Sequence, residues 1–349
     1  MKKPLFLSNL TKTAAVFLMG GVTLLSTGCD EDYLREIFQG NTSDEETADL
    51  RIFASTNTEG NFTIFDVSDL SDVDRITAST GSMDADGIYY REDKDIVYQL
   101  SRTQNMVNAY TDIMDLEGDA TVTPAFSSTA DFTNGREIAV GGNQLVVAED
   151  VDSMNQFVVY NIEQGALTLD RIYDVDIDLW GIQLVGNTLY AVQDQSNMLA
   201  VYYDFGSKPA GHLAADQKVA IEGLVRTHGL SYDAKNDIMV LTDIADAMSD
   251  SDGAFHVIEH FTHKLNDAGD GGTIALKDQI RVAGDKTYLG NPVDIAFSVA
   301  EKKVYAAERA NGGGRLLIFD YPSESGNMKP VAKLDYAGAS AVYLDEAGY

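Results

Sequence analysis

Short apolar runs separated by polar turns extend along most of the chain. Five of these runs, at residues 96–101, 144–149, 188–193, 238–243 and 303–308, are rich in valine, isoleucine, leucine and tyrosine. β-Branched and aromatic residues in short runs between turn formers are typical of β-strands. After residue 49, no stretch has apolar positions at the three- and four-residue spacing of an amphipathic helix. We therefore predict an all-β protein.

The strands recur in a repeat of nearly constant length. A glycine or proline marks the start of one strand in each unit, at Gly87, Gly135, Gly181, Gly229, Pro292 and Gly338, and the intervals are 48, 46, 48, 63 and 46 residues. In the first five units a second, a third and a weaker fourth strand follow. A four-stranded unit of about 45 to 50 residues is the signature of a β-propeller blade.

The two ends of the repeat complete each other. Residues 50–79 supply a second, third and fourth strand without a first, and residues 339–344 supply a first strand alone. We therefore predict a six-bladed β-propeller of four-stranded antiparallel blades, whose C-terminal strand joins the N-terminal blade. Such closure pairs the strand edge that the N-terminal blade would otherwise expose. A seventh blade inside the long interval after Gly229 is the alternative.

Two segments resemble known propeller repeats. Residues 61–73 (NFTIFDVSDLSDV) resemble the repeat of LVIVD-type surface propellers, in which an apolar run ends in Asp-Val-Ser-Asp. Residues 228–243 (HGLSYDAKNDIMVLTD) are similar to units of YVTN, NHL and SMP-30-like propellers. The resemblance covers nearly the whole chain after residue 49, at the level of blade pattern. It implies an architecture, and a shared fold does not transfer a function.

The first 29 residues have the features of an export signal. Lys2 and Lys3 precede an apolar run at residues 14–25, which is too short to span a bilayer and is typical of a secretory signal peptide. The following Ser26-Thr27-Gly28-Cys29 resembles the bacterial lipobox, with Ser26 in place of the usual leucine. The resemblance implies lipid on Cys29. Because Cys29 is the only cysteine, lipidation also accounts for a lone thiol in an exported chain.

These features divide the chain into three parts. We predict a signal peptide at 1–28, a lipidated acidic tether at 29–49 and the propeller at 50–349. Acids directly after a lipidated cysteine resemble the surface-export signals of some Bacteroidota lipoproteins, whereas Asp30 in that position favours inner-membrane retention in enteric bacteria. We expect the outer membrane or cell surface, and the periplasmic face of the inner membrane is the alternative.

The charge of the chain narrows the classes of partner. The chain has 55 Asp+Glu against 25 Lys+Arg, a formal net charge of −30. Cleavage after residue 28 would remove three lysines and no acid. A surface this acidic repels nucleic acid and anionic lipid headgroups, so we exclude both as partners. The acidity is compatible with cation binding and also with a soluble surface in salty water.

Strand order brings two columns of the repeat to one mouth of the propeller. The predicted ligand-binding residues are Asp86, Asn134, Arg136, Trp180, His228 and Asn291, which stand beside the glycine or proline column, and Arg309, which follows the end of a second strand. The residues that close the second strands include the predicted metal ligands Glu149, Asp243 and Glu308, whose carboxylates suit Ca²⁺. His228 is the candidate general base. Solvated loops also produce a polar mouth without any ligand.

One further motif suggests zinc chemistry. Residues 256–260 read H-x-x-E-H, a zinc-peptidase pattern that needs a helix to place both histidines on one face. Here the segment occupies the position of a third strand, on which Glu259 would point away from His256 and His260. We expect ordinary strand histidines. The sequence contains no P-loop, dinucleotide fingerprint or nucleophile elbow.

Two functions agree with these features. The first is a membrane-anchored, exported propeller without enzymatic activity that binds an envelope protein, a glycan or a small polar ligand. The second, which the SMP-30-like resemblance implies, is a calcium-dependent lactonase or esterase that works at the polar mouth. We favour the binding module because no catalytic signature is present.

Overall fold

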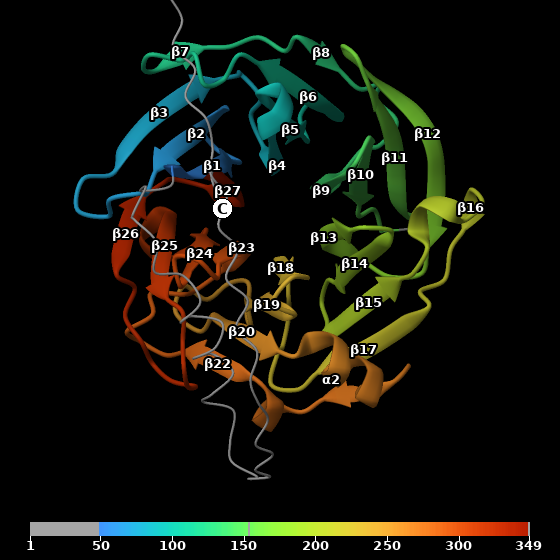
Figure 1. Ribbon diagram of the computed structural model, residues 1–349, viewed down its shortest axis with the longest axis vertical. Helices are drawn as coiled ribbons and strands as arrows, with labels where there is room; N and C mark the ends of the chain where they lie inside the picture. The colour runs from blue at the N-terminus through green and yellow to red at the C-terminus, as the bar shows by residue number, and fades with distance from the viewer. Residues whose placement is uncertain (1–48, 153, 348–349) are drawn as a thin grey trace, which may run out of the picture. The chain divides into compact units, whose positions relative to one another are not determined.

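The computed structural model describes residues 49–152 and 154–347. The described chain forms six small antiparallel sheets in a ring (Figure 1). The prediction of a six-bladed β-propeller is confirmed. The predicted signal peptide, the lipidation site Cys29 and nearly all of the tether lie outside the described residues.

We number the blades from the N-terminus and give the inner strand first. Blade one is β27 (Ala339–Ala347), β1 (Asp49–Thr56), β2 (Asn61–Asp66) and β3 (Asp74–Ser79). Blade two is β4 (Ala85–Arg91), β5 (Ile96–Ser101), β6 (Met106–Thr111) and β8 (Phe126–Ser127). Blade three is β9 (Gly135–Gly141), β10 (Gln144–Glu149), β11 (Asn155–Glu163) and β12 (Ala166–Val175).

The other three blades follow the same order. Blade four is β13 (Leu179–Val185), β14 (Thr188–Gln193), β15 (Met198–Tyr202) and β17 (Gln217–Ile221). Blade five is β18 (Leu230–Asp233), β19 (Ile238–Asp243), β20 (Ala254–Glu259) and β22 (Ile280–Ala283). Blade six is β23 (Pro292–Ser298), β24 (Lys303–Glu308), β25 (Arg315–Asp320) and β26 (Ala332–Asp335).

Strand β27 closes the ring. It pairs antiparallel with β1 from Asp49 opposite Ala347 to Thr56 opposite Ala339. The long interval after Gly229 holds the short helix α2 (Phe261–Ala268) and the strand β21 (Thr273–Ile274) in place of another blade. The alternative of seven blades is therefore wrong. Helix α2 is the one helix of more than three residues in the described part of the chain, and its apolar pattern is too short for detection from sequence.

Three short strands connect neighbouring blades at the outer edge of the ring. Strands β7 (Ala120–Thr121), β16 (Gly211–His212) and β21 each leave the third strand of one blade and pair in parallel with the outer strand of the preceding blade. These pairings satisfy backbone groups at an edge that would otherwise be exposed.

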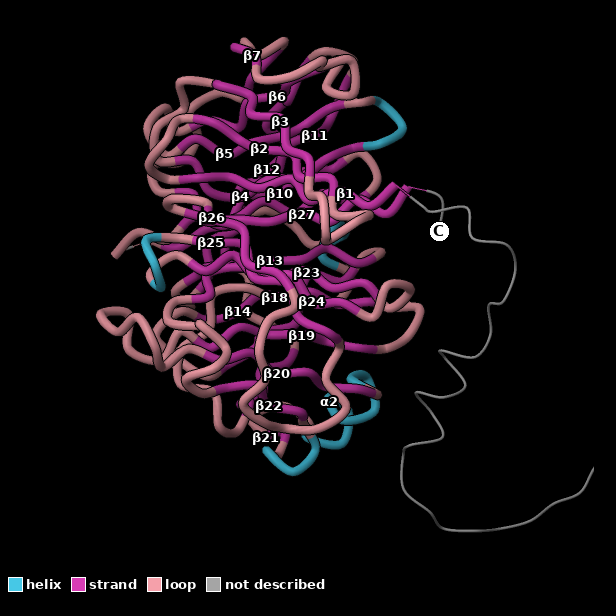
Figure 2. The backbone as a smooth tube through the Cα atoms, turned by 90° about the vertical axis from the view of Figure 1, so that its left-hand side faces the viewer, coloured by secondary structure: helices cyan, strands magenta, loops and turns pink. Residues whose placement is uncertain are grey.

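The core lies between the blades. Each of the six gaps between neighbouring blades contains one apolar cluster of buried side chains. Large aromatics dominate these clusters, for example Phe157 against Tyr202 and Phe205 between blades three and four. Burial of each such side chain is worth about 1.5 to 3 kcal/mol. The tube view in Figure 2 shows the strands stacked as successive layers of this packing.

Glycines let the inner strands approach one another at the mouth. A Cβ on Gly87 would lie 2.3 Å from a carboxylate oxygen of Glu137, and one on Gly181 would lie 2.3 Å from the carbonyl oxygen of His228. A Cβ on Gly229 would lie 2.5 Å from the Cα of Asp294. These contacts with the next blade explain why the repeat contains glycine at these positions.

We expected the glycine or proline that marks each unit to stand at the same place in every inner strand, but in half of the units it stands at a different place. Five inner strands have an irregularity in their pairing at the mouth, as when Asp86 and Gly87 together face one residue of β5. Gly135 pairs with Glu149 and Pro292 with Glu308, so both stand two positions before the place that Gly87 occupies. The residues at that irregular position are Asp86, Arg136, Trp180, Val293 and Ser340, and His228 holds the equivalent place two residues before the first residue of β18; these six are here called the mouth ring.

Candidate functional site at the mouth of the propeller

Three members of the mouth ring form a continuous stack. The guanidinium carbon of Arg136 lies 4.2 Å from the ring centroid of Trp180. On its other face Trp180 is parallel to His228, with centroids 3.5 Å apart and an interplanar angle of 4°. The three residues belong to blades three, four and five, so the stack joins three blades through one cation–π and one aromatic contact.

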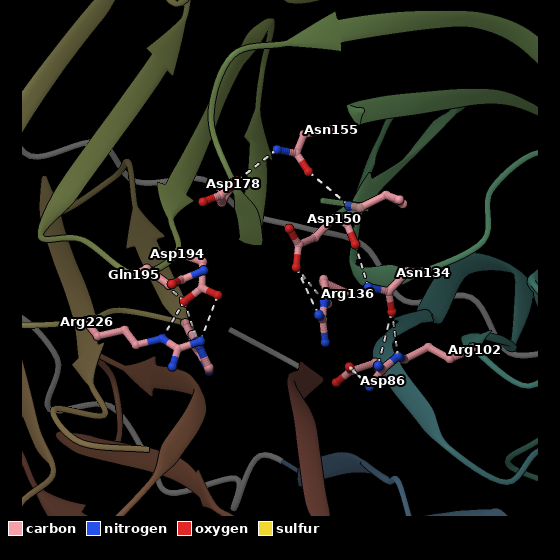
Figure 3. Close-up of polar contacts among 12 residues, drawn as sticks. Asp86, Arg102, Asn134, Arg136, Asp150, Asn155, Asp178, Asp194, Gln195 and Arg226 are labelled. Carbon is pink, nitrogen blue, oxygen red and sulfur yellow. Dashed lines mark hydrogen bonds and ion pairs between the residues drawn. The ribbon is translucent and has the colours of Figure 1, made fainter. Parts of the chain in front are cut away.

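Asp194 lies at the end of this stack that is formed by His228. It follows β14, accepts a hydrogen bond from His228 Nε2 at 3.0 Å and receives two more from Arg226 at 2.6 and 2.8 Å (Figure 3). Burial raises the pKa of Asp194, but the hydrogen bonds from His228 and Arg226 outweigh burial and place this pKa far below its usual range. Asp194 is therefore a carboxylate at every physiological pH.

His228 is neutral in this environment. Burial lowers its pKa to about 4, although Asp194 opposes the shift. Because the carboxylate of Asp194 only accepts hydrogen bonds, the proton of neutral His228 resides on Nε2. Nδ1 is then the basic atom, and it is buried without a hydrogen-bond partner. The candidate general base is thus held by its neighbours and faces away from solvent.

Two more guanidiniums converge on the same opening. Arg136 donates to Asp150 at 2.9 and 3.2 Å, and Arg102 donates to Asn134 (Figure 3). Arg102 also donates to Asp84. The side chains of Arg102, Arg136 and Arg226 are 22, 15 and 25% exposed, so all three are partly accessible to solvent. Each pairs with a carboxylate, which orients the guanidinium without covering it.

Asp86 is the buried acid of the ring. It is 4% exposed, and Arg102 Nη1 lies 3.6 Å from its carboxylate. Burial raises the pKa of Asp86 to about 7, against the opposing charges of Arg102 and Arg136. Its protonation state therefore changes near neutral pH, as is common for groups at functional sites.

The three predicted metal ligands support the backbone of the mouth loops. Glu149 accepts hydrogen bonds from the amide and hydroxyl of Thr133. Glu308 accepts from the amides of residues 290, 291, 310 and 311. Asp243 accepts from the amides of residues 225, 226 and 245. The three carboxylates are in different blades, and the described residues contain no cluster of three or more histidine, cysteine or acidic side chains suited to a metal ion.

The remaining predicted ligand residues are divided between the mouth and its edge. Asn134 bonds Arg102, and the exposed Arg309 lies 3.2 Å from the side chain of Asn57. The side chain of Asn291 donates to the carbonyl of Ala247, away from the stack. Sequence reasoning missed Arg226, because its role depends on a contact with Asp194 of another blade that no spacing reveals.

The residues of the H-x-x-E-H segment separate. His256 is fully buried and bonds Gln279, whereas Glu259 accepts a hydrogen bond from Tyr321. His260 lies outside the strand, at the residue that precedes α2. The segment therefore does not gather its histidines and glutamate at one point.

A cavity of about 340 Å³ occupies the central channel between the inner strands. Glu137 of blade three and Asp294 of blade six, which lie on opposite sides of the ring, are the charged side chains on its wall. Burial raises the pKa of Asp294 to about 7. Burial also raises the pKa of Glu137, and the negative charge of Asp294 adds to this shift. Among the described residues, the wall of this cavity thus carries carboxylates without an arginine, whereas each arginine at the mouth is paired with a carboxylate.

Comparison with known proteins shows the fold. No family model matches the chain, and no curated protein matches it in sequence. A chain of the nidogen/laminin complex is similar with a TM-score of 0.57 and 12% identity, covering 84% of this chain and 98% of that chain. A structure from Bacteroides uniformis, described as a candidate 6-phosphogluconolactonase, has a TM-score of 0.55 and 16% identity, covering 82% of this chain and 83% of its own.

A second structure with the same description comes from Bacteroides fragilis. Its TM-score is 0.55 at 10% identity, and the match covers 87% of this chain and 100% of that chain. The TM-scores show a common propeller architecture, and sequence identities this low leave the activity open.

No helix among residues 49–152 and 154–347 is long and apolar enough to cross a membrane.

Proposed function

We propose that this protein is an exported, lipid-anchored binding module, and that the mouth of its propeller binds an anionic group of an envelope or extracellular partner. The observation that carries the proposal is the convergence of Arg102, Arg136 and Arg226 on one opening of a chain with a net charge of −30. Guanidiniums held in fixed orientation suit carboxylate or phosphate groups, with which they form paired hydrogen bonds.

The surroundings of the arginines favour binding over acid–base catalysis. His228 is 3% exposed, and its hydrogen bond to Asp194 together with the stack on Trp180 fixes the ring. A general base must reach the proton that it removes. A fixed, covered imidazole contributes instead to the rigidity of the mouth, and rigidity reduces the entropy cost of binding.

Calorimetric titration of the purified protein with citrate, glucuronate and inorganic phosphate tests the proposal. We expect at least one of these anions to bind, and Arg136→Ala or Arg226→Ala to weaken its binding about 10- to 100-fold, since a hydrogen bond to a charged group is worth about 1.5 to 3 kcal/mol. Arg171→Ala is the matched control, because Arg171 is 25% exposed on the outer strand β12. Equal loss in all three variants, or no binding of any anion, would reject the mouth as an anion site.

A lactonase is the second candidate, and the fold shared with the two structures described as candidate 6-phosphogluconolactonases is the observation that favours it. Incubation with 6-phosphogluconolactone and measurement of acid release tests this activity. Calcium-dependent hydrolysis that His228→Gln abolishes would establish the enzyme. Hydrolysis at the spontaneous rate would reject the lactonase and leave the binding module as the proposed function.

A further inference from the structure

A second polar cluster lies inside blade five, apart from the mouth ring. His256 of β20 stands directly opposite Arg281 of β22 and opposite Leu241 of β19. Asp243 lies two residues beyond Leu241 and therefore on the same face of the sheet, diagonal to His256. Asp243 and His256 are fully buried.

Asp243 uses one of its two carboxylate oxygens. Oδ1 accepts hydrogen bonds from the amides of Val225, Arg226 and Ala245, each at 3.1 Å. Oδ2 is buried without a hydrogen-bond partner, and the nearest cation, Arg281 Nη2, is 3.7 Å away. This distance exceeds the length of a direct hydrogen bond.

Gln279 fixes the tautomer of His256. Its Nε2 donates to the carbonyl oxygens of Glu222 and Ile274, so its Oε1 faces His256 Nδ1 at 2.8 Å. Because that oxygen only accepts, Nδ1 of His256 carries the proton. Burial lowers the pKa of His256 to about 4, and the ring is therefore neutral at pH 7. Its Nε2 is then a lone-pair acceptor, buried without a partner.

The third unpaired atom is a donor. Arg281 Nε–H is buried and has no acceptor. The cluster therefore presents two unused acceptors, Asp243 Oδ2 and His256 Nε2, together with one unused donor. An unpaired buried polar atom costs about 1 to 3 kcal/mol, so one partner shared by these three neighbouring side chains would stabilise the blade.

The numbers of hydrogen-bond donors and acceptors in the cluster identify its partner as water. Water donates two hydrogen bonds and accepts further ones, and buried waters typically make about three hydrogen bonds. Chloride has no hydrogen to donate to Asp243 and His256. A metal cation could accept both lone pairs, but it offers nothing to Arg281 Nε–H and is repelled by that guanidinium.

We infer that Asp243, His256 and Arg281 form a buried binding site for one water molecule inside blade five. The water donates to Asp243 Oδ2 and His256 Nε2 and accepts from Arg281 Nε. The water thereby gives Asp243 Oδ2 a hydrogen-bond partner, while Oδ1 of the same carboxylate accepts hydrogen bonds from the amides of Val225 and Arg226. The site joins three strands of the blade to the loop that carries Arg226 to the mouth.

A crystal structure of the full propeller at a resolution that orders internal solvent tests the assignment directly. We expect one peak within hydrogen-bond distance of all three atoms, with the electron count of oxygen and no anomalous signal. An anomalous peak would identify a metal or chloride and overturn the assignment. No peak, in a map that shows other internal waters, would also overturn it.

Magnetic relaxation dispersion of water nuclei gives an independent measurement in solution, because it counts waters with long residence times. We expect His256→Phe to lose one such water relative to the wild type. His212→Phe is the control, since the His212 side chain is 63% exposed. An unchanged count in a folded His256→Phe protein would contradict the site, and if that variant does not fold, the wild-type crystal decides.

Discussion

Gly87, Gly181 and Gly229 show how single residues set the geometry of the mouth. Each lies where its inner strand meets the backbone or side chain of the next blade. Glycine is the one residue that permits this approach, since any Cβ would overlap the neighbour. The stack of Arg136, Trp180 and His228 depends on the same approach, because it joins side chains from three successive blades.

Gly181→Ala is expected to destabilise the propeller by about 1 to 3 kcal/mol, the usual cost of overpacking a closely packed site. The new Cβ would lie 2.3 Å from the carbonyl oxygen of His228, which belongs to backbone and cannot move aside easily. Urea denaturation measures the change. The control is Gly326→Ala, where a Cβ meets nothing within 4 Å, and an equal loss at both sites would contradict the role of close approach.

Asp86 makes stability depend on pH. Burial raises its pKa from 3.8 to about 7 in the folded protein, so folding favours the protonated form. The stabilising effect is complete below the unfolded pKa and is lost as the pH rises through 7. Between pH 5 and pH 8 the wild type should therefore lose about 3 kcal/mol of stability through this group, a loss that Asp86→Asn should not show. Parallel pH profiles of the two proteins in urea denaturation would contradict the shift.

At the scale of secondary-structure elements, β27 is the strand on which the ring depends. It is the inner strand of blade one, and it packs beside the inner strands of blades two and six. Without it β1 would expose a full set of backbone donors and acceptors, which invites association with other chains.

Removal of residues 339–349 should lower the urea midpoint and cause aggregation at micromolar concentration, because blade one loses its pairing with β27 over the whole length of β1. Light scattering and circular dichroism measure both effects. A peptide of residues 339–347 added in trans should reduce the scattering. Removal of residues 348–349 alone is the control, and a truncated chain that stays monomeric with an unchanged midpoint would show that β27 is dispensable.

The number of blades and the order of the four strands within each blade were predictable because alternation and period are local properties of the chain. The register at the mouth was not. Glycine at 87 and 181 and glycine at 135 have different structural causes, and sequence alone does not separate a strand irregularity from the turn that precedes it. Pairs such as Arg226 with Asp194 join different blades, so their contact follows from the folded ring rather than from spacing.

At the scale of the whole molecule, charge is distributed unevenly. The chain carries 30 more negative than positive charges, yet three of its arginines meet at one opening. An acidic surface repels anions in general, whereas under the proposed function the guanidiniums attract an anion that reaches the mouth. Under the proposed function, this contrast would make the mouth selective for a small number of anionic groups.

The proposed anchor predicts where the whole molecule is found in a cell. Full-length protein should fractionate with membranes and incorporate a palmitate label, and Cys29→Ser should remove the label and abolish lipidation because no other cysteine is present. Met83→Ser is a control on an exposed residue of the propeller. A label that persists in Cys29→Ser would contradict lipidation at this residue.

The pairing of β1 with β27 also sets an order of events during synthesis. Strand β1 begins at Asp49 and its partner ends at Ala347, so blade one waits for residues made almost 300 positions later. Closing a loop of this length is slow compared with the formation of local hairpins. Blades two to six can form as soon as their own strands emerge, while the first strands made stay unpaired on one side. A chain that crosses a membrane before folding meets this delay without harm, because its first and last strands come together only after the whole ring has been delivered.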